Sequence, residues 1–409
     1  MNKQLGRILL IIALIIFFGC SDKKESEVIY IKESPVKEDA TKEWLNKVEN
    51  YKKDKKYLSV LYGYYNERIK EKKYIKAAEL LDMVCVYLAD SYDFNDQFMT
   101  TVKEFDAKYR KKVPALKSTF VDAYLANYYY DKYDLKKACE YFKNVTLLEP
   151  NDYNSCYKTA RAYYDLSYIY YIMGKQNLSL DANQKSFEYF SKIGNPKGLA
   201  SVYLNYANIY TAIGDKKRAI QNVDKAIKSY KNIDNTYNVY ISLINKISIY
   251  DFLNDPRKEA LIDSVYQVFE KSKDDSKILK IKLYDFKVEN LVQENKLTEA
   301  KEILDNLKSI VENIDSADLT QEYKVTYALY EIKKNPNYSN FDDVKKALPT
   351  LISNQQYEKV TMFYNLLKEN AIQNNDFKSA LHYDAEKQII ADSIGNIASR
   401  GKIAELEAI

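Results

Sequence analysis

Glycine and proline are scarce in this chain. Its 409 residues include 9 Gly and 7 Pro, together about 4 % of the chain, where an average protein has about 12 %. These two residues make most turns and breaks in proteins. A chain with so few of them has little room for β-turns or long irregular loops, so the composition predicts an all-helical protein.

Histidine is almost absent as well. His382 is the one histidine, so the sequence shows no partner for acid–base catalysis. Cys85, Cys139 and Cys156 form no C-x-x-C pair, which argues against a Cys/His metal site. We interpret them as small apolar residues on packed helices, with one disulfide as the alternative.

Motifs that carry chemistry are also missing. The chain has no Gly-rich phosphate loop and no G-x-S-x-G or H-E-x-x-H motif. Its carboxylates are abundant but lie beside lysines, as on solvated helix faces. The sequence therefore predicts a protein that is not an enzyme and that holds no cofactor and no metal.

Net charge is low. It is +4 for the whole chain, and +2 once Lys3 and Arg7 are left out. Charged residues make up 29 % of the chain with the two signs well mixed. Such a small excess gives no reason to expect a nucleic-acid partner or binding to an anionic membrane surface.

The N-terminus has the pattern of a secretory signal. Lys3 and Arg7 precede an uninterrupted apolar run over residues 8–18. Eleven residues are too few to cross a bilayer, which takes about 20. A basic start followed by a short apolar run is typical of a signal peptide, so we expect residues 1–20 to be removed or processed.

This leader ends in Gly19-Cys20 and resembles a bacterial lipobox. In lipoproteins the cysteine is diacylated and becomes the new N-terminus, so the resemblance implies lipidation at Cys20. Phe17 departs from the usual Leu three residues before the cysteine. Residues 21–40 are mostly polar, as a tether would be. The resemblance implies an extracytoplasmic protein anchored to a bacterial membrane by its N-terminal lipid; an ordinary cleaved signal or a transmembrane anchor are the alternatives.

Two sets of positions recur at a spacing of 40 or 41 residues. The first set comprises Tyr129, Tyr170, Tyr210, Tyr250, Leu291, Glu331 and Ala371. The second set comprises Ala138, Ser179, Ala219, Ala260, Ala300, Asn340 and Ala380. A fixed period between 20 and 50 residues is typical of a solenoid built from stacked supersecondary units. Such arrays usually bind partners over a long surface.

The clearest unit covers residues 200–230. Tyr203, Tyr206 and Tyr210 share one face of a helix, because they follow the spacing i, i+3, i+7. Ala219 is expected to be small because two helices cross there. Gly214 is expected to end the first helix in the left-handed conformation that glycine adopts easily.

These positions fit the 34-residue template of the tetratricopeptide repeat (TPR), which the chain resembles over about residues 120–390. The resemblance implies an all-α, right-handed superhelical α-solenoid of helix-turn-helix pairs. The longer period of about 40 resembles the TPR variety of bacterial signalling proteins, and the whole chain resembles the extracytoplasmic TPR region of signalling regulators from Bacteroidetes-type bacteria. Other matches include Pro150, Asn295 and Asn375, at positions that end helices. The units around Tyr250 and Tyr327 are degenerate.

The predicted organisation has five parts. A signal peptide (1–20) and a polar tether (21–40) precede an N-terminal helical cap with one degenerate repeat (41–118). In the cap, 74–84 is expected to be a second helix and 95–109 an extra one. An array of about seven repeats follows (119–390). The last part, 391–409, is a C-terminal helix at which the sequence is complete or truncated before an output domain.

The TPR resemblance also implies a binding groove. In TPR arrays the first helix of each pair lines the concave face at template positions 2, 5, 9 and 12. Carried onto this chain, these positions give Asn127, Tyr130, Arg161, Tyr164, Tyr168, Tyr171, Leu204, Asn208, Thr211, Ile244, Ser248 and Asp251. Asn127 and Asn208 stand where TPR proteins often place an amide that hydrogen-bonds a peptide backbone. Tyrosines in the groove would supply flat contact area.

We therefore expect a non-catalytic scaffold that binds a protein or peptide in this groove. The first interpretation of its role is a sensor or adaptor module of a signalling regulator. The alternative is a structural lipoprotein that takes part in outer-membrane assembly. A third class, the SusD-like glycan-binding lipoproteins, is disfavoured by the single Trp and the 9 Gly.

Overall fold

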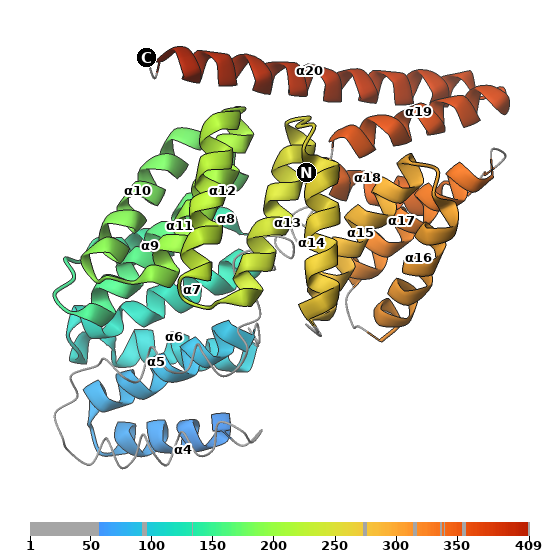
Figure 1. Ribbon diagram of the computed structural model, residues 1–409. Helices are drawn as coiled ribbons and strands as arrows, with labels where there is room; N and C mark the ends of the chain where they lie inside the picture. Colours follow the sequence, from blue (N-terminus) through green and yellow to red (C-terminus); the bar gives the residue numbers. More distant parts are fainter. Residues whose placement is uncertain are drawn as a thin grey trace. The chain divides into compact units, whose positions relative to one another are not determined.

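A computed structural model describes residues 57–91, 96–132, 134–272, 276–313, 317–335, 338, 340–353 and 357–407. Regular structure in these ranges is helical throughout (Figure 1). The fold class expected from the shortage of Gly and Pro is thus confirmed. The leader, Cys20 and the tether lie outside the described residues. So does the start of the cap, up to residue 56.

The described chain divides into two compact units, one that ends at Val202 and one that begins at Tyr203. The division falls inside one helix, Pro196–Ile213 (α11). Before α11 the elements are α4 Tyr57–Lys70, α5 Tyr74–Ser91, α6 Asp96–Lys108, η1 Arg110–Lys112, η2 Ala115–Ser118, α7 Thr119–Asp131, α8 Leu135–Thr146, α9 Tyr153–Ile172 and α10 Gln176–Lys192.

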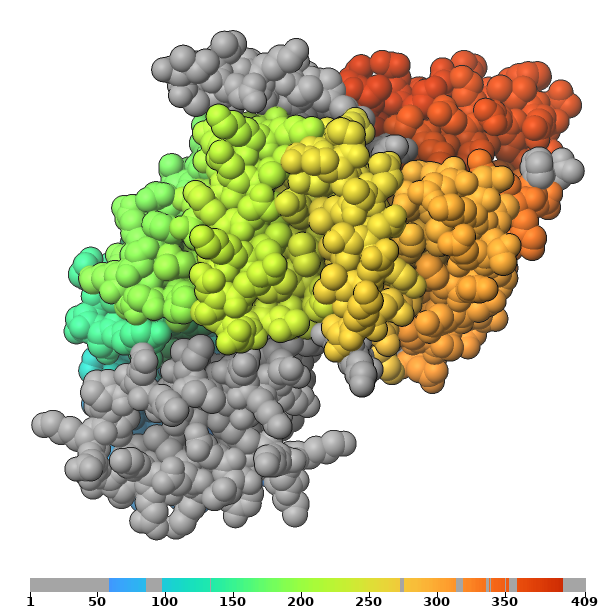
Figure 2. All heavy atoms as spheres, in the orientation of Figure 1, coloured from blue at the N-terminus to red at the C-terminus, as the bar shows by residue number. Residues whose placement is uncertain are grey.

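The elements after α11 continue the succession of helices. They are α12 Lys216–Lys231, α13 Thr236–Phe252, α14 Lys258–Ser272, α15 Lys277–Gln293, α16 Leu297–Val311, α17 Ala317–Lys334, α18 Asp342–Ser353, α19 Tyr357–Gln373 and α20 Phe377–Glu407. Side chains of α12 and α13 fill the space between their ribbons (Figure 2). Among the described residues, no helix combines the length and the apolar character needed to cross a membrane.

Consecutive helices pack as pairs, and tight turns set the pairs. α7 contacts α8, α9 contacts α10, and α15 contacts α16. The turns use left-handed residues where the sequence predicts them, at Gly174, Gly214, Asn295 and Asn375, with φ of 68°, 84°, 62° and 57°. Glycine and asparagine adopt this conformation at low cost. Asp215 then caps α12, since its carboxylate accepts a hydrogen bond of 2.9 Å from the Arg218 amide.

Small residues lie where the two helices of a pair cross. Ala207 and Ala219 are fully buried between α11 and α12, as the repeat pattern predicts. In the preceding pair the same positions hold Ser167 and Ser179. Ser167 Oγ donates to the Ser179 carbonyl (2.8 Å), and Ser179 Oγ donates to the Ser167 carbonyl (2.7 Å). Each buried hydroxyl is therefore satisfied at a crossing that still admits only a small side chain.

Two positions in the small-residue set, Ala260 and Asn340, are not at a crossing. Ala260 is exposed, and its neighbours Ile262 and Val265 are buried instead. In α12 the first helical residue follows Asp215 directly, whereas α14 begins at Lys258, three residues after Asp255. The later start changes the rotation of the helix, so the inner stripe moves on by two residues. Asn340, at the same template position, is also exposed.

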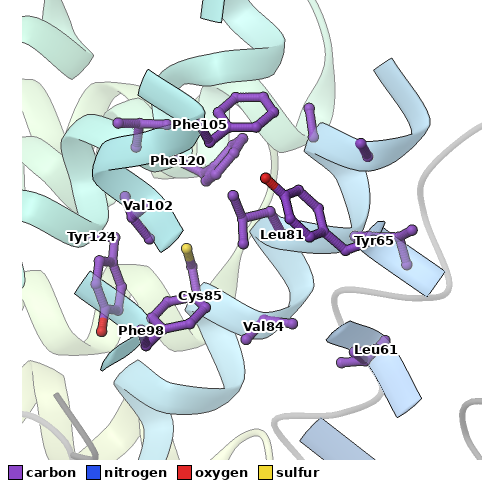
Figure 3. Close-up of a cluster of buried hydrophobic side chains, with 14 of the residues drawn as sticks. Leu61, Tyr65, Leu81, Val84, Cys85, Phe98, Val102, Phe105, Phe120 and Tyr124 are labelled. Atoms are coloured by element: carbon purple, nitrogen blue, oxygen red, sulfur yellow. The ribbon is translucent and has the colours of Figure 1, made fainter. Parts of the chain in front are cut away.

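The first unit is held by an apolar cluster beneath α7 (Figure 3). Phe98 meets Tyr124 edge to face, with ring centroids 4.9 Å apart. The Cys85 thiol lies among these side chains, and burial raises its pKa well above the ordinary value. Cys139 and Cys156 are likewise buried free thiols. The interpretation of the cysteines as packing residues is confirmed for the described chain.

At both ends of the array the structure has helices where the sequence predicts them, but the bounds of these helices differ from the predicted ones. α5 and α6 stand where the sequence predicts a second helix and an extra helix. At the other end, α20 is one continuous helix through the predicted boundary at residue 390 (Figure 1). It begins as the partner of α19 and continues to Glu407.

Candidate functional site

Helices α7 and α9 bring three predicted groove tyrosines together. Tyr130 meets Tyr168 edge to face at 6.4 Å between centroids, and Tyr168 meets Tyr171 at 5.9 Å. Tyr130 and Tyr168 are buried, while Tyr171 is half-buried. We call these three residues the aromatic patch. Rings that are already fixed against one another lose little freedom when a ligand covers them.

A partly buried ion pair lies one to two turns along α9 from this patch. Arg161 Nε donates to Asp165 Oδ2 at 3.2 Å, and the guanidinium lies 5.2 Å from the centroid of the Tyr164 ring. Burial raises the pKa of Asp165, while Arg161 opposes that shift. Tyr164 is only 2 % exposed. It therefore supports the face from beneath and offers a ligand almost no surface.

The two predicted amides differ in availability. Asn127 is half-buried and donates its side-chain NH₂ to the Ala123 carbonyl of its own helix at 2.8 Å. Asn208 is half-buried too; within the part of the chain that the structure describes, its side chain makes no hydrogen bond. Asn208 can thus offer both a donor and an acceptor without breaking an existing bond.

The other predicted groove residues of the second unit are mostly engaged. Leu204 and Ile244 are buried in the core. Thr211 Oγ1 donates to the Ala207 carbonyl at 2.7 Å. Ser248 is exposed and donates to the Ile244 carbonyl at 3.2 Å. Asp251 accepts from Lys258 at 2.9 Å.

Sequence reasoning missed a group of charged residues on the later first helices. The groove positions were carried forward only as far as Asp251. The repeat with Tyr284 at template position 4 places Lys282, Asp285 and Glu289 at positions 2, 5 and 9. Continuing the template would have found these residues, since they lie on the side of α15 that matches the groove side of α11.

These three residues join two more from later first helices. We call the five the charged cluster: Lys282, Asp285 and Glu289 on α15, Glu322 on α17 and Lys359 on α19. Lys282 Nζ lies 3.2 Å from a carboxylate oxygen of Glu322. Lys359 Nζ lies 3.4 Å from Asp285 Oδ2 and also pairs with Glu289. The cluster therefore links three successive repeats.

Burial shapes the charges of this cluster. Burial raises the pKa of Asp285 well above its ordinary value; Lys359 opposes the shift, and Glu289 and Glu322 add to it. Burial alone would lower the pKa of Lys359, but attraction to Asp285 and Glu289 outweighs it, so that pKa is raised. The lysine therefore stays charged, and a proton is favoured on the Asp285 carboxyl.

The cluster is a polar recognition surface more than a metal site. In the described ranges, no group of three or more His, Cys, Asp or Glu side chains is arranged to hold a metal ion. The two lysines already neutralise most of the carboxylate charge here. What the arrangement can do is pair with charged or hydrogen-bonding groups of a partner.

No protein-family model and no curated protein matches the chain. Solved structures do match it in fold. Aspartyl phosphate phosphatase F from Bacillus subtilis aligns over 96 % of this chain and 94 % of its own, with TM-score 0.52 and 14 % identity. The Rap conjugation gene regulator of plasmid pLS20, in complex with the Phr* peptide, aligns over 84 % and 97 %, with TM-score 0.53 and 14 % identity.

The apo form of the quorum sensor NprR from B. thuringiensis gives a similar result. It aligns over 86 % of this chain and 97 % of its own, with TM-score 0.53 and 15 % identity. Identities this low speak for the fold alone. Together with the helix pairs described above, the comparisons make the chain a TPR-like helical solenoid.

Proposed function

We propose that this protein is a non-catalytic TPR-like scaffold that binds a peptide along its first helices. We further propose that it acts outside the cytoplasm as a sensor or adaptor, tethered by lipid at Cys20. The similarity to TPR signalling regulators of Bacteroidetes-type bacteria belongs to the same proposal. The partner is a peptide or an extended segment of a protein.

One observation carries the proposal. The first-helix positions hold polar and aromatic groups where a simple packing role would favour aliphatic ones. In the first unit the half-buried Tyr171 of the aromatic patch offers ring surface, and in the second unit Asn208 offers an amide with no hydrogen bond in the described chain. An extended peptide needs both kinds of contact, because its backbone must be hydrogen-bonded and its side chains must be covered.

The structural neighbours support the same proposal. One is named as a regulator in complex with the Phr* peptide, and another is named as a quorum sensor. A third is named as an aspartyl phosphate phosphatase; among the described residues of this chain, no group of three or more His, Cys, Asp or Glu side chains could hold a metal ion. Peptide binding is thus the function that the fold and the face support together.

Peptide capture tests the proposal. Purified protein is immobilised and exposed to a pool of random hexapeptides, and bound peptides are identified by mass spectrometry. We expect enrichment of a defined set, weakened roughly five- to thirtyfold by Tyr168→Ala and by Asn208→Ala. Lys185→Ala, on the exposed side of α10, is the control and should bind as wild type. Capture that is equal in all four proteins would contradict the proposed face.

The tether is tested separately in cells. Cys20→Ala should move the protein from the membrane fraction to the soluble one, because the apolar run is too short to anchor it. Ser21→Ala serves as the matched control and should stay with the membrane. If the Cys20 variant stays membrane-bound like the control, lipid at Cys20 is not the anchor.

A further inference from the structure

The charged cluster is not balanced. It holds three carboxylates, Asp285, Glu289 and Glu322, against two ammonium groups, Lys282 and Lys359. Burying an uncompensated charge is costly, so a site of this kind takes up a further cation or a proton. When a ligand occupies the face, a group of that ligand can provide this positive charge.

The excess of negative charge in the cluster acts mainly on Asp285. This residue is 4 % exposed, and no amide, hydroxyl or ammonium group of the described chain donates to its buried Oδ1 atom; the Glu289 carboxyl is its neighbour. Its other oxygen, Oδ2, lies 3.4 Å from Lys359 Nζ. An acceptor buried in this way costs free energy until a donor reaches it.

Two of the three carboxylates of the cluster are partly exposed to solvent. The Glu289 and Glu322 side chains are 18 % and 22 % exposed, against 5 % for Asp285. A slender positively charged group could therefore enter past the two glutamates and end at Asp285. Lys282 stands at the template position of Arg161, and Glu289 at that of Tyr168 and Asn208, whereas Asp285 stands at the buried position of Tyr164 and Leu204.

We propose that the charged cluster is a specificity site for one cationic group of the bound peptide, an ammonium or guanidinium that pairs with Asp285 and Glu289. This inference rests on the proposed function, because it names the peptide chemistry that the first-helix face selects. The cation would take the place of a proton: the carboxyl O–H of the Asp285–Glu289 pair gives its proton to solvent as the cation binds.

The exchange predicts the pH dependence of binding. The groups that act on Asp285 are Lys359 from α19, Glu289 on its own helix and Glu322 from α17. Burial is the main cause of its raised pKa, which favours a proton on Asp285 as long as no cation is bound. Binding a cation favours the ionised carboxylate, so affinity should rise as pH rises through that pKa, with proton release.

The test uses the full protein and two chemically matched pools of random hexapeptides, one with free and one with acetylated N-termini. Wild-type protein should enrich Lys or Arg at one position, or free over acetylated N-termini. Asp285→Asn and Glu289→Gln should each lose that enrichment roughly tenfold while still capturing peptides. Asp263→Asn is the control. It removes the carboxylate on α14 that pairs with Lys287, and this variant should keep the enrichment.

The strongest captured peptide then goes into calorimetry in buffers of different ionisation enthalpy. We expect release of up to one proton per peptide in the wild type and a smaller release in Asp285→Asn. Circular dichroism verifies that each variant is folded; if Asp285→Asn unfolds, Glu289→Gln, at a more exposed residue, decides. Peptides captured with no preference for positive charge would overturn this inference and leave peptide binding standing. Capture of no peptide at all would overturn both.

Discussion

The aromatic patch and the charged cluster lie on the first helices of different repeats, yet they have opposite chemistry. In the first unit, tyrosines from α7 and α9 cover one another. In the second, lysines and carboxylates from α15, α17 and α19 pair across three repeats. The helix pairs beneath are built alike, with a left-handed turn and a small residue at the crossing. The packing within the helix pairs thus recurs along the chain, whereas the residues on the first-helix face differ from repeat to repeat.

This difference has an energetic consequence. Aromatic contacts stabilise through buried area and ring geometry, so each ring contributes nearly independently of pH. Ion pairs in a partly buried site depend on every member, because removal of one leaves another uncompensated. The two faces should therefore respond differently to substitution, and the predictions below test that contrast.

The largest effect is expected at Lys359. Lys359→Met keeps the length of the side chain and removes the charge that faces Asp285 and Glu289. We expect a loss of roughly 3 kcal/mol in the free energy of unfolding, as for other partly buried pairs that lose one partner. Urea denaturation measures it. Lys301→Met, which breaks the exposed pair with Asp305, should cost about 0.5 kcal/mol or less. Equal costs would mean that the cluster is no more than a surface network.

Substitutions at two alanines test the packing within the helix pairs, which is common to both units. Ala219→Leu should overpack a crossing with no free space and cost roughly 1–3 kcal/mol. Ala260→Leu, at the corresponding template position but exposed, should change stability by about 0.5 kcal/mol or less. Thermal unfolding of the pair provides the comparison. Similar losses in both would show that the rotation of α14 differs from the one described.

The charged cluster should also make stability depend on pH. The folded-state pKa of Asp285 is raised, mainly by burial, so above about pH 4 the unfolded chain releases a proton that the folded chain keeps. Stability should then fall as pH rises toward the folded pKa, by up to about 1.4 kcal/mol per pH unit. Asp285→Asn should remove this slope. Parallel curves for the two proteins between pH 5 and 8 would contradict the assignment.

The smallest effect on stability is expected on the open face. Asn208→Ala removes a half-buried side chain with no hydrogen bond in the described residues, so the free energy of unfolding should change by about 0.5 kcal/mol or less. Ser167→Ala removes a buried hydroxyl that bonds the Ser179 carbonyl and should cost more, about 1 kcal/mol. The order would be reversed if Asn208 were a packing residue.

Much of the fold could be predicted from the sequence because the repeat is a local pattern. Gly214, Asn295 and Asn375 end helices for reasons of backbone geometry that act over a few residues. Ala260 keeps the spacing of the repeat but is exposed, because two extra turn residues follow Asp255. The repeat period gives only the number of residues between equivalent positions. The face that a helix buries depends on the residue at which the helix begins.

The candidate site could be predicted only in part. Tyr130 and Tyr168 fall on one face and meet, since the template places neighbouring first helices side by side. The burial of Tyr164 and Leu204 could not be predicted from the template. The template predicts on which face of the helix a residue lies, but not how deeply its side chain is buried. Lys359 pairs with a residue 74 positions away, and no local pattern in the sequence reports such a contact.

One measurement tests the central claim, that the first helices form the binding face. A captured hexapeptide is rebuilt with a photoreactive benzophenone residue, bound to the wild-type protein and irradiated, and the crosslinked positions are found by mass spectrometry. The account predicts crosslinks on the first helices α7, α9, α11, α13, α15 or α17, reduced by excess unlabelled peptide. Crosslinks confined to the second helices, α8, α10, α12, α14 or α16, would contradict it.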